Sequence, residues 1–340
     1  MTKSDAPTLA DVARLAGVST ASISRALNEP DKVAEATRKK IETAIETLGY
    51  TPHFGGRALA SRRTNTVGAV IPSMANAMFA NGLQAFQEEL AKEGVTLLVA
   101  TTGFDPAQEA LQIKALVARG ADGLLLIGND RAAETWDFLD KRSVPHVVSW
   151  IDMARPGQHF VGFDNEAAAA RAAKAALDLG HRRIAVIAGE CATNDRARAR
   201  LAGVRSCVEA FGQGARLTHV VEVPYKLDDA AAAFRQIMAQ AETPTVVICA
   251  NDAQAAGAMI AARDMGLSLP QDMSFVGFDD IGIARVVWPA LTTVRVPQQE
   301  MGQVAARLLL AKLAGAHTLS STRLETQMIM RGSLVAPAKA

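Results

Sequence analysis

The chain has 340 residues, 49% of them apolar, so two or three domains with a large buried core are expected. It has no run of about 18 uncharged apolar residues and no charged segment followed by an apolar signal core, which argues against a membrane-spanning or exported protein and for a cytoplasmic one. The formal net charge is +1, but residues 1–64 hold ten Lys and Arg against seven Asp and Glu, a local excess that suits attraction to DNA.

The first predicted elements are two short helices joined by a tight turn. Thr8 stands where a helix needs an N-cap, with Asp11 in the first turn, and Gly17 ends this helix before Ser19 caps the next. The expected buried positions are Leu9, Val12, Ala13, Ala16, Ile23 and Leu27, and the expected outward positions are Thr20, Ala21, Ser24 and Arg25. The pattern predicts a helix-turn-helix, whose second helix lies in the major groove of DNA. A small helical hairpin without a DNA partner is the alternative.

A third helix is predicted from Glu35 to Leu48, where Gly49 ends it. From Thr66 onward, short apolar strands alternate with amphipathic helices, and the cycle restarts near Ile184. This alternation predicts parallel sheets with right-handed crossovers in two similar α/β lobes. The expected strands are 67–71, 96–100, 123–127, 184–187, 245–249 and 274–278, and the expected helices are 79–93, 107–119 and 198–211. Ligands of open parallel sheets bind beyond the carboxyl ends of the strands, so a cleft between the lobes is the expected binding site.

Polar and aromatic side chains follow several of these strands. They are Ser73, Asn76, Phe79, Trp150, Asp152, Arg196, Arg198, Arg200, Asn251, Asp252, Asp279 and Asp280. An Asn or Asp at a strand end is also a common helix cap, and Phe79 and Trp150 also suit the core, so these alternatives stay open. Residues 196 and 200 share a helical face, whereas 198 points elsewhere. Because guanidinium groups bind carboxylates bidentately, the arginines favour an anionic or hydroxyl-rich ligand.

Three cysteines lie at Cys191, Cys207 and Cys249. Their odd number and their spacing are typical of reduced thiols and not of disulfides or a zinc site, so no metal and no cofactor are expected. An enzyme is not indicated either, because the sequence has no Walker-type phosphate loop and no Gly-x-Ser-x-Gly elbow. His181, in Gly-His-Arg-Arg at a strand entrance, is expected to be structural.

The chain resembles the LacI/GalR family of bacterial transcription regulators along almost its whole length. The matching segments are Thr8-Leu-Ala-Asp-Val-Ala, Ala16-Gly-Val-Ser, Ser22-Ile-Ser-Arg-Ala-Leu-Asn28, Leu48-Gly-Tyr-x-Pro52 and Arg57-Ala-Leu59. The resemblance implies a sequence-specific regulator of transcription, most simply a repressor. It also implies a DNA-binding head at 1–50, a hinge helix or linker at 51–64, a two-lobed periplasmic-binding-protein-like core at 65–335 and a tail at 336–340. The first lobe is expected at about 65–161 and 292–322, and the second at about 162–291 and 323–335. A transport receptor with the same core would need export and no DNA head.

The resemblance further implies which residues contact double-stranded operator DNA. Thr20, Ala21 and Arg25 are expected to read base edges, and Leu59 to wedge into the minor groove. The other expected DNA contacts are Thr8, Ser19, Ser22, Ser24, Asn28, Thr37, His53 and Arg57. His53 and Gly55-Gly56 depart from the residues usual in the family's hinge, which predicts a hinge whose order depends strongly on DNA and dimer contacts.

In the family, positions that match Arg200, Asn251 and Asp279 line a cleft for a small-molecule effector. The remaining expected effector contacts are Ser73, Asn76, Phe79, Trp150, Asp152 and Arg196. Segments 72–80, 161–166 and 194–196 look most like the gluconate-regulator branch, which implies a sugar acid; a neutral sugar or a purine is the alternative. An operator with two half-sites needs a two-fold dimer, and only a short tail without heptads follows Ser333, so a homodimer is expected. Cleft closure is expected to control DNA binding.

Overall fold

The computed structural model of the chain describes residues 6–51, 63–153, 155–316 and 318–338. It divides into a unit of Met1–Thr64 and a unit of Asn65–Ala340. The predicted contacts His53, Arg57 and Leu59 lie outside the described residues, as do Gly55-Gly56 and the side chain of Asn28. None of the helices in the described ranges combines the length and the apolar composition that a membrane crossing needs.

The first unit contains three α-helices around a small apolar core. They are α1 (Leu9–Ala16), α2 (Thr20–Asn28) and α3 (Glu35–Leu48), with a short 3-10 helix (Pro30–Lys32) between the last two. Val12, Ile23 and Ile41 are almost completely buried in this core, whereas Leu9 and Leu27, which were predicted to be buried, are only half-buried. Gly17 and Gly49 end α1 and α3 with φ values of 67° and 60°, a left-handed conformation that favours glycine. The predicted helix-turn-helix is confirmed as a fold.

The second unit contains two six-stranded sheets, one in each lobe. In the first lobe the order is β11-β5-β4-β3-β1-β2, and in the second it is β12-β10-β9-β8-β6-β7. All neighbouring strands are parallel except β10 and β12. The strands are β1 (Thr66–Ile71), β2 (Thr96–Thr101), β3 (Gly123–Ile127), β4 (His146–Ser149), β5 (Phe160–Gly162), β6 (Arg183–Ala188), β7 (Arg216–Glu222), β8 (Val246–Cys249), β9 (Ser274–Asp279), β10 (Thr292–Arg295), β11 (Thr322–Arg323) and β12 (Gln327–Ile329).

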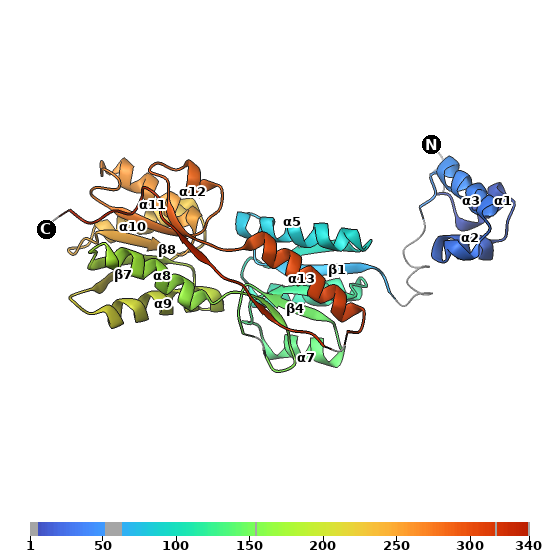
Figure 1. The fold of residues 1–340 in the computed structure, drawn as a ribbon, viewed down its shortest axis with the longest axis horizontal. Helices are drawn as coiled ribbons and strands as arrows, with labels where there is room; N and C mark the ends of the chain where they lie inside the picture. The colour runs from blue at the N-terminus through green and yellow to red at the C-terminus, as the bar shows by residue number, and fades with distance from the viewer. Residues whose placement is uncertain (1–5, 52–62, 154, 317, 339–340) are drawn as a thin grey trace. The chain divides into compact units, whose positions relative to one another are not determined.

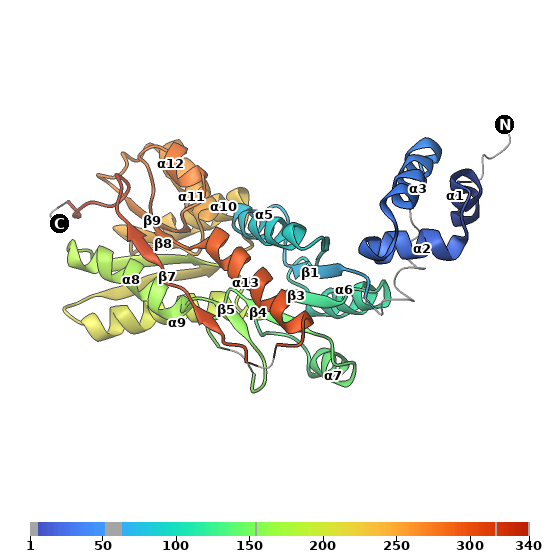
Figure 2. The same cartoon turned by 45° about the vertical axis from the view of Figure 1, so that its right-hand side comes forward.

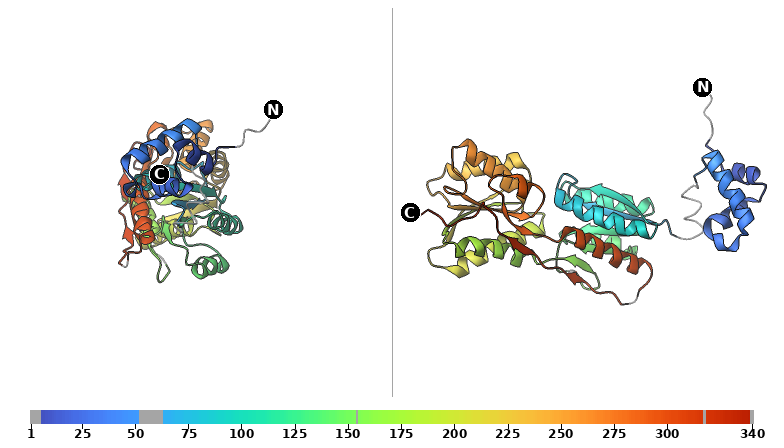
Figure 3. Two further views of the ribbon diagram at one scale, coloured as in Figure 1. Left: turned by 90° about the vertical axis from the view of Figure 1, so that its right-hand side faces the viewer. Right: turned by 45° about the horizontal axis from the view of Figure 1, so that its top comes forward.

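Helices cover both faces of each sheet (Figure 1). In the first lobe α5 (Ala77–Lys92) and α13 (Gln298–Leu313) lie side by side on one face, with α6 (Pro106–Ala118) and α7 (Ala133–Lys141) on the other. The second lobe has α8 (Asn165–Asp178) and α9 (Asp195–Phe211) on one face, and α10 (Leu227–Met238), α11 (Asp252–Asp264) and the short α12 (Ile283–Val286) on the other. The right-hand view of Figure 3 shows this arrangement. In β3, Leu125 packs in the layer of α5 and α13, while Leu124 and Leu126 pack with α6 and α7, as the alternation of a strand requires.

The chain crosses between the lobes after β5, after β10 and after β11. Figure 2 shows β11 beside β5 at the edge of the first sheet. The predicted return to the first lobe at 292 is wrong, because Thr292–Arg295 lies between β9 and β12 in the second sheet. The predicted start of a helix at 198 is also wrong: α9 begins at Asp195, since the Asn194 side chain accepts a hydrogen bond from the Ala197 amide and caps it.

Candidate functional site

One face of α2 carries the polar residues predicted to face outward. Thr20, Ala21, Ser24 and Arg25 are all exposed, while Ile23 on the opposite face is buried. This surface can donate and accept hydrogen bonds along its length, as a helix that reads base edges must do.

Other predicted DNA contacts of the head take part in helix caps. The Thr8 hydroxyl accepts from the Asp11 amide at 3.3 Å, and the Asp11 carboxylate accepts from the Thr8 amide at 2.9 Å. Ser19 Oγ accepts from the Ser22 amide at 3.1 Å, and the two serine hydroxyls lie 2.9 Å apart. Thr37 is half-buried in the first turn of α3. Thr8 and Ser19 therefore fix the starts of α1 and α2, whereas Thr37 makes no cap, since α3 begins without a side-chain cap.

A cavity of about 540 Å³ lies between the lobes, at the carboxyl ends of strands from both sheets. Ser73 and Asn76 line it, and Asn76 also caps α5 by accepting from the Met78 amide at 3.1 Å. Phe104 from the first lobe and Tyr225 from the second have ring centroids 5.5 Å apart at its wall. The full lining is Pro72, Ser73, Met74, Ala75, Asn76, Thr101, Gly103, Phe104, Glu190, Asn194, Pro224, Tyr225 and Lys226.

Three cavity residues that follow β7 were not predicted from the sequence, namely Pro224, Tyr225 and Lys226. This edge strand was not predicted because its interior positions are only half-buried and include Thr218 and His219, so it contains no buried apolar run. The rule that ligands bind beyond strand ends would have found these residues once the strand was known.

Arg200 and Asp279 lie in the second lobe and do not line the large cavity. Arg200 is 6% exposed; its Nε donates to Asn165 Oδ1 at 2.9 Å, its Nη1 donates to the Ala250 carbonyl at 2.8 Å, and its guanidinium lies 3.9 Å from the centre of the Phe278 ring. Arg200 Nη1 is 3.9 Å from Asp279 Oδ1, an ion pair without a direct hydrogen bond.

Asp279 is the least satisfied polar group of this region. It is 1% exposed, and neither carboxylate oxygen has a hydrogen-bond partner among the described residues. Burial raises the pKa of Asp279 to about 7, and the charge of Arg200 opposes this rise. A buried acceptor in this condition is suited to a ligand that brings hydrogen-bond donors.

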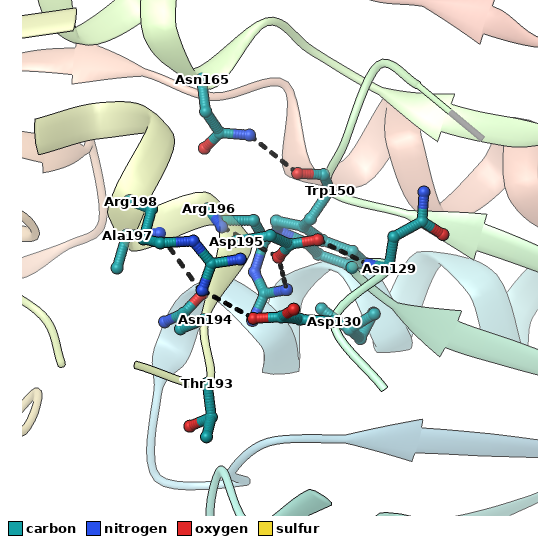
Figure 4. A network of polar contacts seen from close by, with 12 residues as sticks. Asn129, Asp130, Trp150, Asn165, Thr193, Asn194, Asp195, Arg196, Ala197 and Arg198 are labelled. Carbon is teal, nitrogen blue, oxygen red and sulfur yellow. Dashed lines mark hydrogen bonds and ion pairs between the residues drawn. The ribbon is translucent and has the colours of Figure 1, made fainter. Parts of the chain in front are cut away.

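Arg196 is 7% exposed, and its Nη1 donates to Asp195 Oδ1 at 2.7 Å (Figure 4). Burial lowers the pKa of Arg196, and the neighbouring Asp195 carboxylate opposes this. Arg198 is exposed and forms an ion pair with Asp130 at 2.7 Å. The prediction that 198 points away from 196 and 200 is confirmed.

Phe79 and Trp150 are buried in the first lobe, with ring centroids 5.4 Å apart in an edge-to-face contact. In the part of the chain that the structure describes, Trp150 Nε1 finds no hydrogen-bond partner. Asp152 forms an ion pair with Arg323 of β11 at 2.7 Å and is not part of the cavity lining. These three residues therefore support the first lobe, and only Trp150 retains an unused donor.

The remaining strand-end residues have structural partners. Asn251 caps α11 by accepting from the Gln254 amide at 2.8 Å, and Asp252 accepts from Thr293 Oγ1 and the Ile281 amide. Asp280 forms ion pairs with Arg295 and Arg331. Each of these three residues therefore has a local structural partner, and the predicted effector contact of Asn251 stays a prediction.

His181 is also structural, as predicted. It is completely buried, and its two ring nitrogens lie 2.8 Å from Thr245 Oγ1 and the Val335 carbonyl. These contacts tie the start of the second sheet to the end of the chain.

Comparison with known proteins places this geometry in a family. The description "Bacterial regulatory proteins, lacI family" matches residues 8–53, and "Periplasmic binding protein-like domain" matches residues 173–334. The HTH-type transcriptional repressor CytR of Escherichia coli (strain K12) is 32% identical over 330 residues, 96% of either chain. The transcriptional regulator CelR in complex with cellobiose has a TM-score of 0.71 at 31% identity and covers 96% of this chain and 99% of its own. The lac repressor dimer bound to operator and the anti-inducer ONPF has a TM-score of 0.84 at 25% identity, covering 97% and 99%. Because a relative is this similar along nearly the whole length, the chain belongs to the lacI family of bacterial regulatory proteins.

Proposed function

We propose that the chain is a transcriptional repressor whose affinity for operator DNA is controlled by a small molecule bound between the two lobes. The observation that carries this proposal is the presence, in one chain, of a helix-turn-helix with an exposed polar face and a two-lobed core with a 540 Å³ cavity. Relatives that are named repressors along the same length support it. Such a protein acts in the cytoplasm on chromosomal DNA and catalyses no reaction.

In this proposal α2 enters the major groove. Arg25 pairs with guanine edges, and the methyl groups of Thr20 and Ala21 contact thymine. The other head positions, namely Thr8, Ser19, Ser22, Ser24, Asn28 and Thr37, contact phosphates with their hydroxyls, amides or helix ends. His53, Arg57 and Leu59 remain proposed hinge contacts. Two heads are needed for two half-sites, so the functional form is a homodimer, as in the lac repressor complex named above.

The proposed effector is rich in hydroxyl groups. Asp279 needs donors, and a sugar hydroxyl supplies them; Trp150 Nε1 needs an acceptor, which a hydroxyl or ring oxygen also supplies. Cellobiose in the complex of CelR is a ligand of this class. We therefore place a sugar first among the candidates, bound near Arg200, Asn251 and Asp279 and reaching the cavity at Ser73 and Asn76.

A gluconate-type sugar acid is the second candidate, and the buried Arg196 is the observation that favours it. The existing partners of the arginines limit how it binds, because Arg196 is paired with Asp195 and Arg200 lies 3.9 Å from the Asp279 carboxyl group. A ligand carboxylate would replace Asp195 as the partner of Arg196.

The DNA half of the proposal is tested by selecting genomic fragments with the purified protein and measuring their affinity at several salt concentrations. Arg25→Ala is expected to weaken binding to selected fragments by about 1–3 kcal/mol and to relax base preference at one position of each half-site. The control Arg14→Ala, which removes an exposed side chain of α1, should keep the preference. Equal binding of the unaltered protein to selected and random DNA would contradict the proposal.

The effector half is tested by thermal unfolding in the presence of neutral sugars, sugar acids and purines. A ligand that binds only the folded core raises its melting temperature. We expect a shift with sugars that is lost in Asp279→Asn. A shift confined to sugar acids and lost in Arg196→Ala would select the second candidate, and a shift confined to purines would reject both.

A further inference from the structure

The two lobes contact one another directly through charged groups near the cavity. The loop after β3 brings Asn129 and Asp130 of the first lobe against the first turns of α9 in the second lobe (Figure 4). The Asn129 amide donates to Asp195 Oδ2 at 2.6 Å, and Arg198 Nη1 donates to Asp130 Oδ2 at 2.7 Å. These bonds exist only while the lobes are close.

The first-lobe side of this contact is held rigidly by Arg131. Its Nη1 donates to the Gly128 carbonyl at 2.8 Å, and its Nε and Nη2 donate to the two carboxylate oxygens of Glu109 in α6 at 3.2 and 2.8 Å. The guanidinium also lies 4.7 Å from the centre of the buried Trp136 ring. A bidentate, buried pair of this kind fixes the path of the loop.

The second-lobe side is held by the start of α9. Arg198 Nη1 also donates to the Cys191 carbonyl at 2.6 Å, which orients the guanidinium toward Asp130. Because both partners are positioned within their own lobes, little side-chain freedom remains to be lost when the lobes meet.

We propose that Asp195, Arg198, Asn129 and Asp130 form an interlobe latch that sets the closure of the cleft. The inference rests on the proposed effector site and concerns its regulation. Asp195 connects the latch to that site, because its Oδ1 neutralises Arg196 while its Oδ2 accepts the Asn129 amide. A neutral ligand leaves this arrangement intact. An anion that takes Arg196 from Asp195 changes the partners of a residue that the latch uses, so the effector site and the latch are connected through Asp195.

The latch is tested by hydrogen–deuterium exchange of the full-length chain, without operator or effector. The Asn129 amide is a direct reporter, since its hydrogen bond crosses between the lobes. Asp130→Lys is expected to increase exchange in peptides that cover residues 128–131 by about three- to tenfold. The exchanged pair Asp130→Lys with Arg198→Glu is expected to bring the rate back toward that of the unaltered protein.

Asp264→Lys is the matched control, because it breaks the Arg235–Asp264 pair, 3.0 Å long and partly exposed, within the second lobe alone. It should leave exchange at Asn129 unchanged. Unchanged exchange in Asp130→Lys would overturn the latch. A double variant that exchanges as fast as Asp130→Lys would also overturn it, because the faster exchange would then come from a change within the loop of residues 128–131. Neither readout involves DNA or ligand, so these outcomes are separate from the failure of the proposed function.

Discussion

At the scale of single residues, Asp279 has the most unusual environment, a buried carboxyl group whose two oxygens lack hydrogen bonds within the described chain. Burial raises its pKa from 3.8 to about 7, although Arg200 opposes the rise. Between about pH 4 and pH 7 the unfolded chain therefore carries Asp279 ionised while the folded chain carries it protonated. The folded state binds more protons than the unfolded state in this pH window. The contribution of Asp279 to the free energy of unfolding therefore falls as the pH rises from about 4 to about 7, and it is constant at higher pH.

Asp279→Asn is expected to abolish this dependence. The free energy of unfolding of the variant, relative to the unaltered protein, should rise between pH 4 and pH 8 by about 2–4 kcal/mol. Urea denaturation at several pH values measures this difference in the free energy of unfolding. Any destabilisation by the substitution that does not depend on pH shifts all values equally and leaves their change with pH unaffected. Asp264→Asn, at an exposed carboxyl group, provides a control with a flat difference. A flat difference for Asp279→Asn as well would show that this carboxyl group is ionised in the folded chain.

At the scale of elements, the cap of α1 shows how a local signal determines a boundary. Thr8 and Asp11 satisfy each other's backbone amides in a capping box, so Thr8→Ala is expected to destabilise the head by about 1 kcal/mol. Exchange of amides in residues 9–16 of the full-length chain should accelerate about fivefold. Thr47→Ala, which removes an exposed hydroxyl that donates to the Thr43 carbonyl within α3, should change little. Equal effects of the two substitutions would argue against the cap.

The elements that could be predicted from the sequence are those with local signals. Caps and glycines gave the head helices, and buried apolar runs gave β1, β3 and β9 within one residue of their observed ends. The half-buried edge strand β7 offered no such run, and with it the cavity residue Tyr225 was missed. The start of α9 was misplaced because Asn194 acts as its cap.

The candidate site was predictable only in part, for a related reason. Strand ends identified Arg196, Arg200 and Asp279, but no local pattern encodes a pair such as Arg198 and Asp130, which are 68 residues apart. Such pairs determine which side chains are neutralised and which face the cavity. These pairs follow from the packing of one lobe on the other, and the local pattern of residues along the sequence does not specify that packing.

At the scale of the whole core, Gly128 lies where the two lobes meet. It has a φ of 72°, and a Cβ built there would lie 1.8 Å from Arg196 Nη1 and 2.6 Å from Asp195 Oδ1, both in the second lobe. Gly128→Ala is therefore expected to hold the lobes apart. We expect a larger radius of gyration in small-angle X-ray scattering and faster exchange of the Asn129 amide, together with weaker binding of any ligand that both lobes contact.

The backbone cost of this substitution can be separated from its steric effect. Gly94 in the first lobe has a similar φ of 66°, but a Cβ there would meet no atom within 4 Å. Gly94→Ala therefore carries the same left-handed strain, about 1 kcal/mol, without touching the second lobe. It should lower stability and leave the scattering profile unchanged. Expansion of the core by Gly128→Ala alone would mean that the lobes meet at this glycine. Equal expansion by both variants would point to local backbone strain as the cause. No expansion by either variant would mean that the Arg196 side chain has moved aside.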